Sequence, residues 1–250
     1  MPKLSLAQHF KQYFRVVRAD TDELKQMVYK IRYDVYAKEL QYEKNCPKDC
    51  EKDQFDDYSH YALIQHLRTQ AYAGCVRLVI PPQDNQQALL PFEQCCMDSV
   101  EPEEMNVITR HGKLFYGEIS RLAVLASFRR RKGESANPYG INIDHSLAGV
   151  TEDEIRLFPF IAVALYLSAS VIALENNLNH VIVMMEPRLS RLLARYGICF
   201  KQIGRVMEYH GKRAMFSLDK KTLFDKLKPE LMDFFEMVKV DMSPEQLEQV

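Results

Sequence analysis

The stretch EISRLAVLASFRRRKGES, residues 118–135, is the part of this sequence that most strongly determines the expected fold. It opens on three polar side chains, Glu118, Ser120 and Arg121, within a segment that alternates like a strand. A cationic turn that ends in glycine follows, with the sequence Arg129-Arg130-Arg131-Lys132-Gly133. Backbone amides can converge on a phosphate at such a turn, and arginines add charge-assisted hydrogen bonds. The pattern predicts either a strand with a phosphate-binding turn or a core strand followed by a solvated basic loop.

Length and composition limit the classes of protein to which this chain can belong. The chain has 250 residues, 47% of them hydrophobic, so it can bury a full core as one large domain or two small ones. Its formal net charge is −1, which gives no global field to attract nucleic acid. The N-terminus, MPKLSLAQHFKQYF, lacks the long apolar core of a signal peptide, so we expect a cytoplasmic protein.

The six cysteines are too few and too irregularly spaced for a disulfide scaffold. Cys46 and Cys50 could form a bridge or bind a metal, but no second Cys/His pair stands at ligand spacing. We therefore expect reduced, mostly buried thiols and predict no metal site.

Residues 157–174 form an uncharged stretch about as long as a membrane-spanning helix. The stretch contains Pro159, Tyr166 and two serines, and charged residues flank it on both sides. A helix buried on all faces within a soluble sheet protein gives the same pattern, and we favour that interpretation.

The remaining pattern predicts strands and helices in alternation. We expect strands at 13–17, 61–67, 72–80 and 180–185, with a final strand pair at 198–207 and 214–218. We expect helices at 21–40, 91–97, 156–176 and 187–196. Residues 41–58, the rest of 83–113, and 135–153 are interpreted as loops.

Two charged features stand near the first long helix. Arg32 lies close to the apolar stripe of that helix, so its side chain could be drawn inward, whereas the usual arrangement of such an arginine is a packed stem with the guanidinium in water. The run Glu51-Lys52-Asp53-Gln54-Phe55-Asp56-Asp57 follows in the loop, and on local grounds it is typical of a solvated segment.

Residues 219–250 differ in character from residues 1–218, because apolar side chains recur there at amphipathic spacing among lysines and acids. This tail could cover the core, pack on a partner or make weak contact with a membrane surface. We expect a main domain at 1–218 with an amphipathic helical tail packed on it or flanking it.

The order of these elements resembles the GNAT acyltransferase fold. That resemblance implies an α/β (α+β) architecture, a three-layer αβα sandwich around a mixed, largely antiparallel sheet. The charged residues are similar to those of acyl-homoserine-lactone synthases and their N-acyl amino acid synthase relatives. Such enzymes carry an arginine on the first helix, an E-x-D-x-x-D motif, a strand arginine, and E-x-S-R or a variant. Here those positions are Arg32, Glu51, Asp53, Asp56, Arg77, Glu118, Ser120 and Arg121.

A closer resemblance is to the acyltransferase-like family associated with PEP-CTERM/exosortase systems. The segments that carry it are GCVRLVIPP (74–82), GEISRLAVLASFRRRKGE (117–134), MMEPRLSRLLARYGICF (184–200) and IGRVMEYHGKRA (203–214). The resemblance spans roughly residues 14 to 214, and several motifs recur in order.

The resemblance implies acyl transfer from a thioester to an amine. Glu118 would be the general base for the amine, with Ser120 and Arg121 beside it and backbone amides near Arg121 and Leu122 polarising the carbonyl. Pairing of Glu118 with Arg121 or Arg77 for purely structural reasons is the alternative. The acceptor site, for an amino acid or related small amine, would comprise Arg32, Glu51, Asp53, Asp56 and Arg77.

The donor site is also implied by the resemblance. Leu122, Ala123 and Val124 would run beside a pantetheine arm, with its phosphate at Arg129, Arg130, Arg131 and Gly133. The surplus of cations suits acyl carrier protein, an acidic partner, although CoA could be the donor; no permanently bound cofactor is expected. Met184, Met185, Leu165 and Leu192 could line an acyl pocket, but as ordinary core residues they would give the same pattern.

The sequence departs from the family patterns at several positions. Ser135 ends the phosphate-loop pattern where Gly or Ala is usual, and Leu193 stands where many GNAT enzymes carry a tyrosine general acid. The chain has no Trp, and Tyr42 is the nearest candidate for the tryptophan of the lactone synthases. This favours an N-acyltransferase acting on an amino acid. An acyl-homoserine-lactone synthase using S-adenosylmethionine, and a non-catalytic acyl-carrier or lipid-binding module, are the alternatives.

Overall fold

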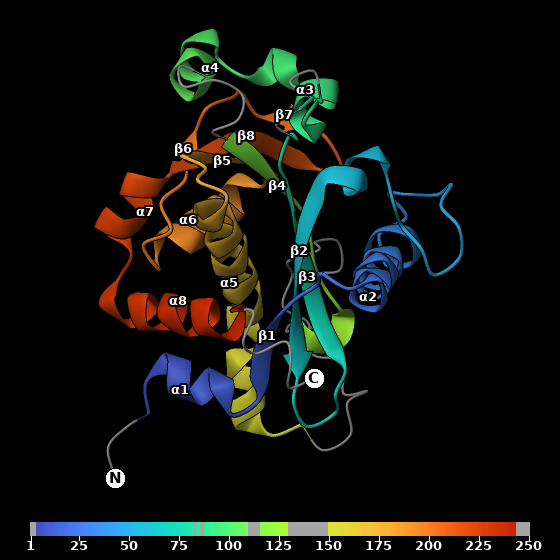
Figure 1. Ribbon diagram of the computed structural model, residues 1–250, viewed down its shortest axis with the longest axis vertical. Helices are drawn as coiled ribbons and strands as arrows, with labels where there is room; N and C mark the ends of the chain where they lie inside the picture. The colour runs from blue at the N-terminus through green and yellow to red at the C-terminus, as the bar shows by residue number, and fades with distance from the viewer. Residues whose placement is uncertain (1–3, 83, 86–87, 110–115, 130–149, 244–250) are drawn as a thin grey trace.

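The protein is built on one eight-stranded sheet (Figure 1), described by a computed structural model over residues 4–82, 84–85, 88–109, 116–129 and 150–243. The strand order is β1-β2-β3-β4-β5-β8-β6, and β7 pairs with β8 outside this path. The strands are β1 (Phe14–Arg18), β2 (Ser59–His66), β3 (Tyr72–Val79), β4 (Tyr116–Val124), β5 (His180–Met185), β6 (Lys201–Gln202), β7 (Met207–Glu208) and β8 (Lys212–Asp219).

The centre of the sheet is its one parallel junction among the described strands. Residues 116–119 of β4 pair with residues 180–183 of β5, and every other described pair is antiparallel. Beyond Ile119, β4 continues to Val124 with no further pairing to β5. The mixed, largely antiparallel sheet expected from the sequence is confirmed, and it opens between its two central strands.

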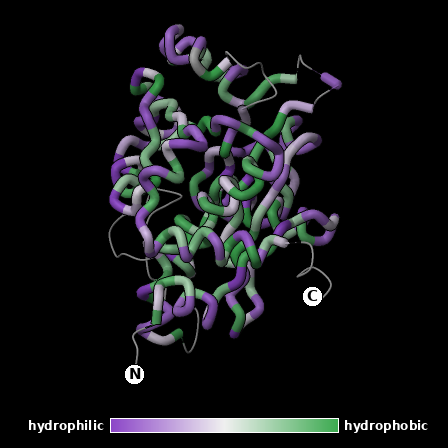
Figure 2. The backbone as a smooth tube through the Cα atoms, turned by 60° about the vertical axis from the view of Figure 1, so that its left-hand side comes forward, coloured by the Kyte–Doolittle hydropathy of each residue, from purple (hydrophilic) through white to green (hydrophobic). Residues whose placement is uncertain are grey.

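One face of the sheet is covered by α5 (Glu152–Glu175), together with α1 (Leu6–Lys11), α6 (Pro187–Ala194) and the C-terminal helices. By length and composition α5 could cross a membrane, yet most of its residues are buried inside the fold. Figure 2 shows hydrophobic segments of the chain gathered in the interior of the molecule. The interpretation as a core helix therefore holds.

The other face is covered by two separate groups of helices. The helix α2 (Asp22–Arg32) is capped by the Thr21 hydroxyl and continues as a π-helix, Tyr33–Glu39, and it packs over β2, β3 and β4. The helices α3 (Pro91–Cys95) and α4 (Pro102–Thr109) cover the sheet near β5 and β8, around Phe92 and Ile182. With α5 on the opposite face, the expected three-layer arrangement is present.

Some elements differ from the sequence-based expectation. The helices α1 and α4 were not predicted, and short 3-10 helices occur at Gln54–Tyr58, Met97–Ser99 and Ala126–Phe128. The expected strand at 198–207 is broken into β6 and β7, because the chain between them turns aside at Gly204 to bridge Val100. The helix expected from 156 begins at Glu152, where Thr151 and Glu154 form a capping box. The loop predicted at 135–153 lies mostly outside the described residues.

The tail forms two helices, α7 (Lys220–Lys226) and α8 (Pro229–Asp241). Apolar side chains of α8 are buried in the same cluster as α5; they are Leu231, Phe234, Phe235 and Val238. At the end of α8, Asp241 accepts a hydrogen bond from the backbone N–H of Val16 in β1 at 3.2 Å. The tail thus covers the core and reaches the edge strand of the sheet.

The cysteines depart from the expectation of reduced thiols at one place. Cys95 and Cys96, at the end of α3, are joined by a disulfide. Cys46 and Cys50 are not bridged, and both are partly exposed.

Candidate active site

A bulge in β4 shapes the site. Between the pairs Cys75↔Ala123 and Arg77↔Ser120, two residues of β4 oppose the single residue Val76 of β3. Arg121, one of the two, has a φ of 51°. A bulge of this kind bends its strand and re-aims its side chains. The hydroxyl of Tyr36 donates to the carbonyl of Leu122 at 2.7 Å, which fixes the bulge against the π-helix that follows α2.

A cavity of about 70 Å³ lies where β4 and β5 separate. Its walls come from β4, β5, α3, the segment after α2 and the turn between β7 and β8. The buried Tyr166 of α5 closes it from the opposite face of the sheet. The lining residues are Tyr36, Tyr42, Glu43, Pro91, Phe92, Cys95, Glu118, Ile119, Ser120, Arg121, Leu122, Tyr166, Val183, Met184, Tyr209, His210 and Arg213.

Glu118 is the buried carboxylate of this cavity, with 4% of the residue exposed. Its Oε2 accepts a hydrogen bond from the backbone N–H of Phe92 at 2.7 Å. Burial raises the pKa of Glu118 to about 8, against the opposing effects of that hydrogen bond and of the nearby Arg77 and Arg121. Within the described part of the chain it forms no salt bridge. A carboxyl group in this state can accept a proton near neutral pH.

Of the two arrangements expected for Arg32, the structure shows the inward one: the residue is fully buried and its guanidinium does not reach water. Its guanidinium forms salt bridges with Glu51 and, at 2.6 Å, with Asp56. Burial opposes the charge of Arg32, but the two carboxylates raise its pKa well above the usual value. The acidic run is therefore not simply a solvated loop: Glu51 and Asp56 are drawn inward because the buried cation needs paired charges.

Arg77 and Arg121 extend this ionic network to β3 and β4. Arg77 Nη1 lies 2.6 Å from Asp53 and 2.9 Å from Asp56, and its Nε donates to Ser120 Oγ at 3.0 Å. Arg121 contacts Glu51 at 3.2 Å, Asp53 at 3.3 Å and Glu43 at 3.0 Å. The network connects α2, the loop at 51–56 and the two strands β3 and β4.

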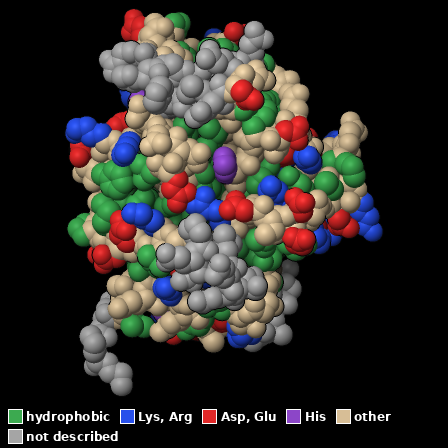
Figure 3. Space-filling model, viewed as in Figure 1, with side chains coloured by type: hydrophobic (Ala, Val, Ile, Leu, Met, Phe, Trp, Pro, Cys, Tyr) green, Lys and Arg blue, Asp and Glu red, His purple; other side chains and the backbone are tan. Residues whose placement is uncertain are grey.

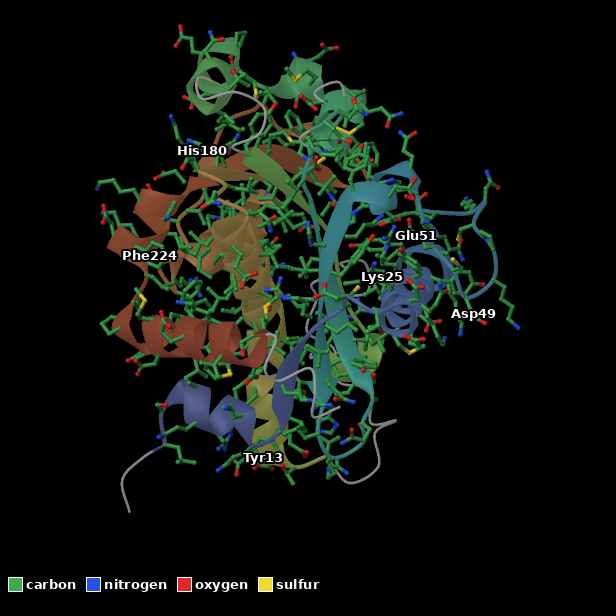
Figure 4. The ribbon with its side chains drawn as sticks, viewed as in Figure 1. Tyr13, Lys25, Asp49, Glu51, His180 and Phe224 are labelled. Carbon is green, nitrogen blue, oxygen red and sulfur yellow. A yellow bond between two sulfur atoms is a disulfide. The ribbon has the colours of Figure 1, made fainter. Side chains whose placement is uncertain are left out.

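The ionic network lies beside the cavity rather than around it. None of the five residues expected to hold the acceptor lines the cavity, namely Arg32, Glu51, Asp53, Asp56 and Arg77. Figure 4 places Glu51 between α2 and the strands β2 and β3. Ser120 and Arg121 belong both to the network and to the cavity wall. The network therefore touches the cavity through β4.

The residues expected along the donor site are only partly described. Leu122 lines the cavity, while Ala123 and Val124 are buried in the sheet. Arg129 is buried and forms a salt bridge with Glu39. Arg130, Arg131 and Gly133 lie outside the described residues.

The four residues considered for an acyl pocket are dispersed. Met184 lines the cavity, and its sulfur lies 3.9 Å from that of Cys96. Met185 and Leu165 are fully buried in the main core. Leu192 is 39% exposed on α6, away from the cavity lining.

Sequence reasoning missed the aromatic wall of the cavity. The ring of Tyr42 stacks on that of His210, with centroids 4.3 Å apart, and Tyr209 and Arg213 lie close in the same hairpin. Burial, then the charge of Arg213, lowers the pKa of His210. The Gly211 turn signals a hairpin, but its place opposite Tyr42 depends on the strand order of the whole sheet.

The described surface is mixed in charge. Figure 3 shows acidic and basic side chains interspersed across the face it presents, with apolar patches between them. This agrees with the formal net charge of −1.

The central part of the chain matches a known protein family. Residues 31–136, which hold the ionic network and β4, match the family described as Acetyltransferase (GNAT) domain. No curated protein matches the chain.

Solved structures match over most of the chain. TofI in a ternary complex with an inhibitor and MTA is 16% identical with a TM-score of 0.55, covering 87% of this chain and 99% of its own. FeeM, an N-acyl amino acid synthase from uncultured soil microbes, is 12% identical with a TM-score of 0.55, covering 88% and 97%. MesI, a CoA-dependent acyl-homoserine lactone synthase, is 17% identical with a TM-score of 0.53, covering 90% and 95%. Residues 31–136 therefore match a GNAT domain, and the chain as a whole shares its fold with TofI, FeeM and MesI.

Proposed function

We propose that the protein is an N-acyltransferase that moves a fatty acyl group from an acyl carrier protein or CoA thioester to the amino group of an amino acid or related small amine. The observation that carries the proposal is Glu118, a buried carboxyl group with a pKa of about 8 at the opening between β4 and β5. An α-amino group has a pKa near 8, so an amine and this carboxyl group can exchange a proton at neutral pH.

The proposed step is direct transfer. The amine nitrogen attacks the thioester carbonyl, a C–N bond forms and the C–S bond breaks, while the amine proton passes to Glu118 directly or through one water. The thiolate leaves without an assigned general acid, because its pKa near 8.5 makes it an adequate leaving group. Backbone amides at the bulge of Arg121 and Leu122 are the proposed donors to the developing oxyanion.

The ionic network has a positioning role in this proposal. The arginines and carboxylates hold Ser120 and Arg121 in the cavity wall, and Glu43 and Arg121 present opposite charges to an acceptor. An amino acid carries both an amine and a carboxylate, so it suits such a pair. The donor arm is proposed to pass between β4 and β5. A cytoplasmic location and an association with PEP-CTERM/exosortase systems remain predictions from the sequence.

The test is mass spectrometry of products. Purified protein is incubated with a panel of acyl carrier protein and CoA thioesters, with pooled amino acids and S-adenosylmethionine as acceptors. We expect an N-acyl amino acid that is absent with Glu118→Gln. Thioester binding without product, across acceptors and pH, would favour a non-catalytic acyl-carrier or lipid-binding module instead.

The second candidate is an acyl-homoserine-lactone synthase. MesI bears that description, and Tyr42 lies at the cavity as the nearest equivalent of the missing tryptophan. An acyl-homoserine lactone formed from S-adenosylmethionine in the same assay would favour this candidate over the amino acid acyltransferase.

A further inference from the structure

The Cys95–Cys96 disulfide lies beside the proposed reaction centre. Cys95 is exposed, and it lines the cavity that holds Glu118. It stands three residues after Phe92, whose backbone N–H donates to Glu118. Side chains at this helical spacing share one face, with their Cβ atoms about 5–6 Å apart. Cys95 therefore borders the space in which the thioester is proposed to react.

The two sulfur atoms of the disulfide differ in access. Cys96 is only 3% exposed, and its Sγ lies 3.9 Å from Met184 Sδ. The backbone of Cys96 is held on both sides. Its N–H donates to the carbonyl of Phe92 at 2.8 Å, and its carbonyl accepts from the hydroxyl of Ser99 at 2.7 Å. An attacking thiolate can thus reach the sulfur of Cys95, and Cys96 is the buried leaving group.

A structural role explains this disulfide poorly. In the chain-entropy account, a disulfide stabilises a fold by closing a loop in the unfolded chain, and the effect grows with the length of that loop. Cys95 and Cys96 are adjacent, so their bond encloses no intervening residues. Exposed disulfides are also the more easily reduced ones, and they commonly serve regulation or catalysis.

The proposed reaction supplies a partner for exchange with this disulfide. Acyl transfer breaks the C–S bond of the thioester and releases a pantetheine thiol, whether the donor is CoA or a carrier protein. A thiol held in the same cavity has an effective concentration towards Cys95 on the order of millimolar or higher. Cys46, Cys50 and Cys199 are partly exposed too, but none of them belongs to the cavity lining given by the described residues.

We propose that Cys95 is a site of reversible thiol–disulfide exchange with the pantetheine thiol that acyl transfer releases. The sulfur of the thiol bonds to Cys95 Sγ, the Cys95–Cys96 bond breaks, and the proton of the thiol ends on Cys96. No net oxidation occurs, because one S–S bond replaces another. Attack by Cys96 on the mixed disulfide reverses these steps and frees the arm.

The mixed disulfide has a consequence for turnover. While it lasts, the pantetheine arm occupies the cavity beside Glu118 and excludes a new donor. The inference rests on the proposed function, which supplies both the thiol and its path between β4 and β5.

The test isolates one half of the exchange. The variant Cys96→Ser keeps Cys95 as a free thiol and lacks the group that would release the adduct. It is incubated with pantethine, the symmetric disulfide of pantetheine, so that Cys95 gains one pantetheine while a second leaves as the thiol. Peptide mapping by mass spectrometry measures the rate at each cysteine. We expect Cys95 to react at least about 10-fold faster with pantethine than with glutathione disulfide.

Two other cysteines provide the matched control within the same protein. Cys50 and Cys199 are partly exposed and lie outside the cavity lining. Their preference for pantethine over glutathione disulfide should be less than about 3-fold, because only the intrinsic reactivity of the two reagents distinguishes them there. The same preference at Cys95 as at these two residues overturns the inference.

The wild type provides a second measurement if Cys96→Ser does not fold by circular dichroism. The disulfide form is mixed with pantetheine or with glutathione at equal thiolate concentration, and the reaction is stopped with acid. Opening of the Cys95–Cys96 bond should be at least about 10-fold faster with pantetheine. Equal rates of opening count against a site for the pantetheine arm.

These readouts separate the exchange site from the proposed function, since adduct formation needs no turnover. A selective adduct at Cys95, with no acylation product from any protein, leaves the exchange site standing while the acyltransferase proposal fails. If product does form, the pantetheine adduct of Cys96→Ser should acylate at least about 10-fold more slowly than the unmodified variant, and dithiothreitol should restore the rate. An adduct that leaves the rate unchanged overturns the placement of the arm in the cavity.

Discussion

The backbone N–H of Phe92 holds Glu118 Oε2 at 2.7 Å, across 26 positions of sequence. Phe92 stands in the first turn of α3, so the bond joins the separate α3–α4 cover of the sheet to the central strand. A hydrogen bond of this kind favours the ionised carboxylate, yet burial dominates and the pKa of Glu118 stays near 8. Small movements of α3 should therefore change the basicity of the site.

Activity should depend on the ionisation of Glu118. As the general base it acts when deprotonated, so kcat/KM for amine acylation should rise with pH up to an apparent pKa near 8. The substitution Glu118→Gln should lower kcat/KM by on the order of 100-fold or more, because a general base contributes about that much. It should also abolish the rise of kcat/KM with pH. A pH–rate profile of both proteins measures this. An unchanged profile in the variant would exclude Glu118 as the base.

The same residue should reduce stability at alkaline pH. The carboxyl group titrates at about 8 in the folded protein and near 4.5 when unfolded, so the folded state holds its proton more tightly. Its contribution is fully present below pH 4.5 and is lost as the pH rises through 8. Between pH 4.5 and 8.5, the free energy of unfolding of the Glu118→Gln variant should rise by up to about 5 kcal/mol relative to that of the wild type. Urea unfolding at both pH values measures this difference.

Removing the cation at the centre of the ionic network should greatly reduce the stability of the fold. Arg32→Met leaves buried Glu51 and Asp56 without their shared partner, and loss of one member of a buried ion pair costs about 3–5 kcal/mol. Lys30→Met on the same helix breaks only exposed pairs and should cost less than about 1 kcal/mol. Denaturant melts compare the two. Similar losses in both variants would mean that the network contributes little.

Acid should weaken the cap of α5. Burial alone would raise the pKa of Glu154, but hydrogen bonds from Thr151, Arg68 and His66 hold it at about 2. Its stabilising contribution is present above pH 4.5 and is lost as the pH falls towards 2. Glu154→Gln should therefore cost about 2–3 kcal/mol at pH 6 and much less at pH 2.5. Thermal unfolding at these pH values provides the comparison.

The sequence correctly predicted those helices and strands whose bounds depend on neighbouring residues alone. The strand β5 was expected at 180–185 and occupies His180–Met185, and α6 begins at its proline as predicted. An apolar run is enough to indicate such a strand, and a proline in the first turn is enough to indicate where such a helix begins. The buried helix was also recognised, since an apolar stretch with flanking charges fits a core element.

The fate of single charges could not be predicted in the same way. The pattern around Arg32 describes only its own helix, while its burial depends on Glu51 and Asp56, which follow some twenty residues later. The cavity likewise needs His210 beside Tyr42, which the strand order of the sheet brings together. The resemblance to known enzymes identified β4, but the bulge at Arg121 requires the register with β3.

The hydrogen bond from the backbone N–H of Val16 to Asp241 decides which tail variants can be used to test membrane contact. An open strand edge is a template for pairing with other chains, and α8 lies against the edge strand β1. Truncation at about Lys220 would remove this protection together with the buried Phe234 and Phe235, so aggregation should follow. If the truncated fragment failed to bind liposomes, the loss would reflect self-association of misfolded chains, and it would not show that the tail itself contacts lipid. Replacement of an exposed tail residue, such as Phe224→Ser, keeps the edge protected and tests lipid contact directly.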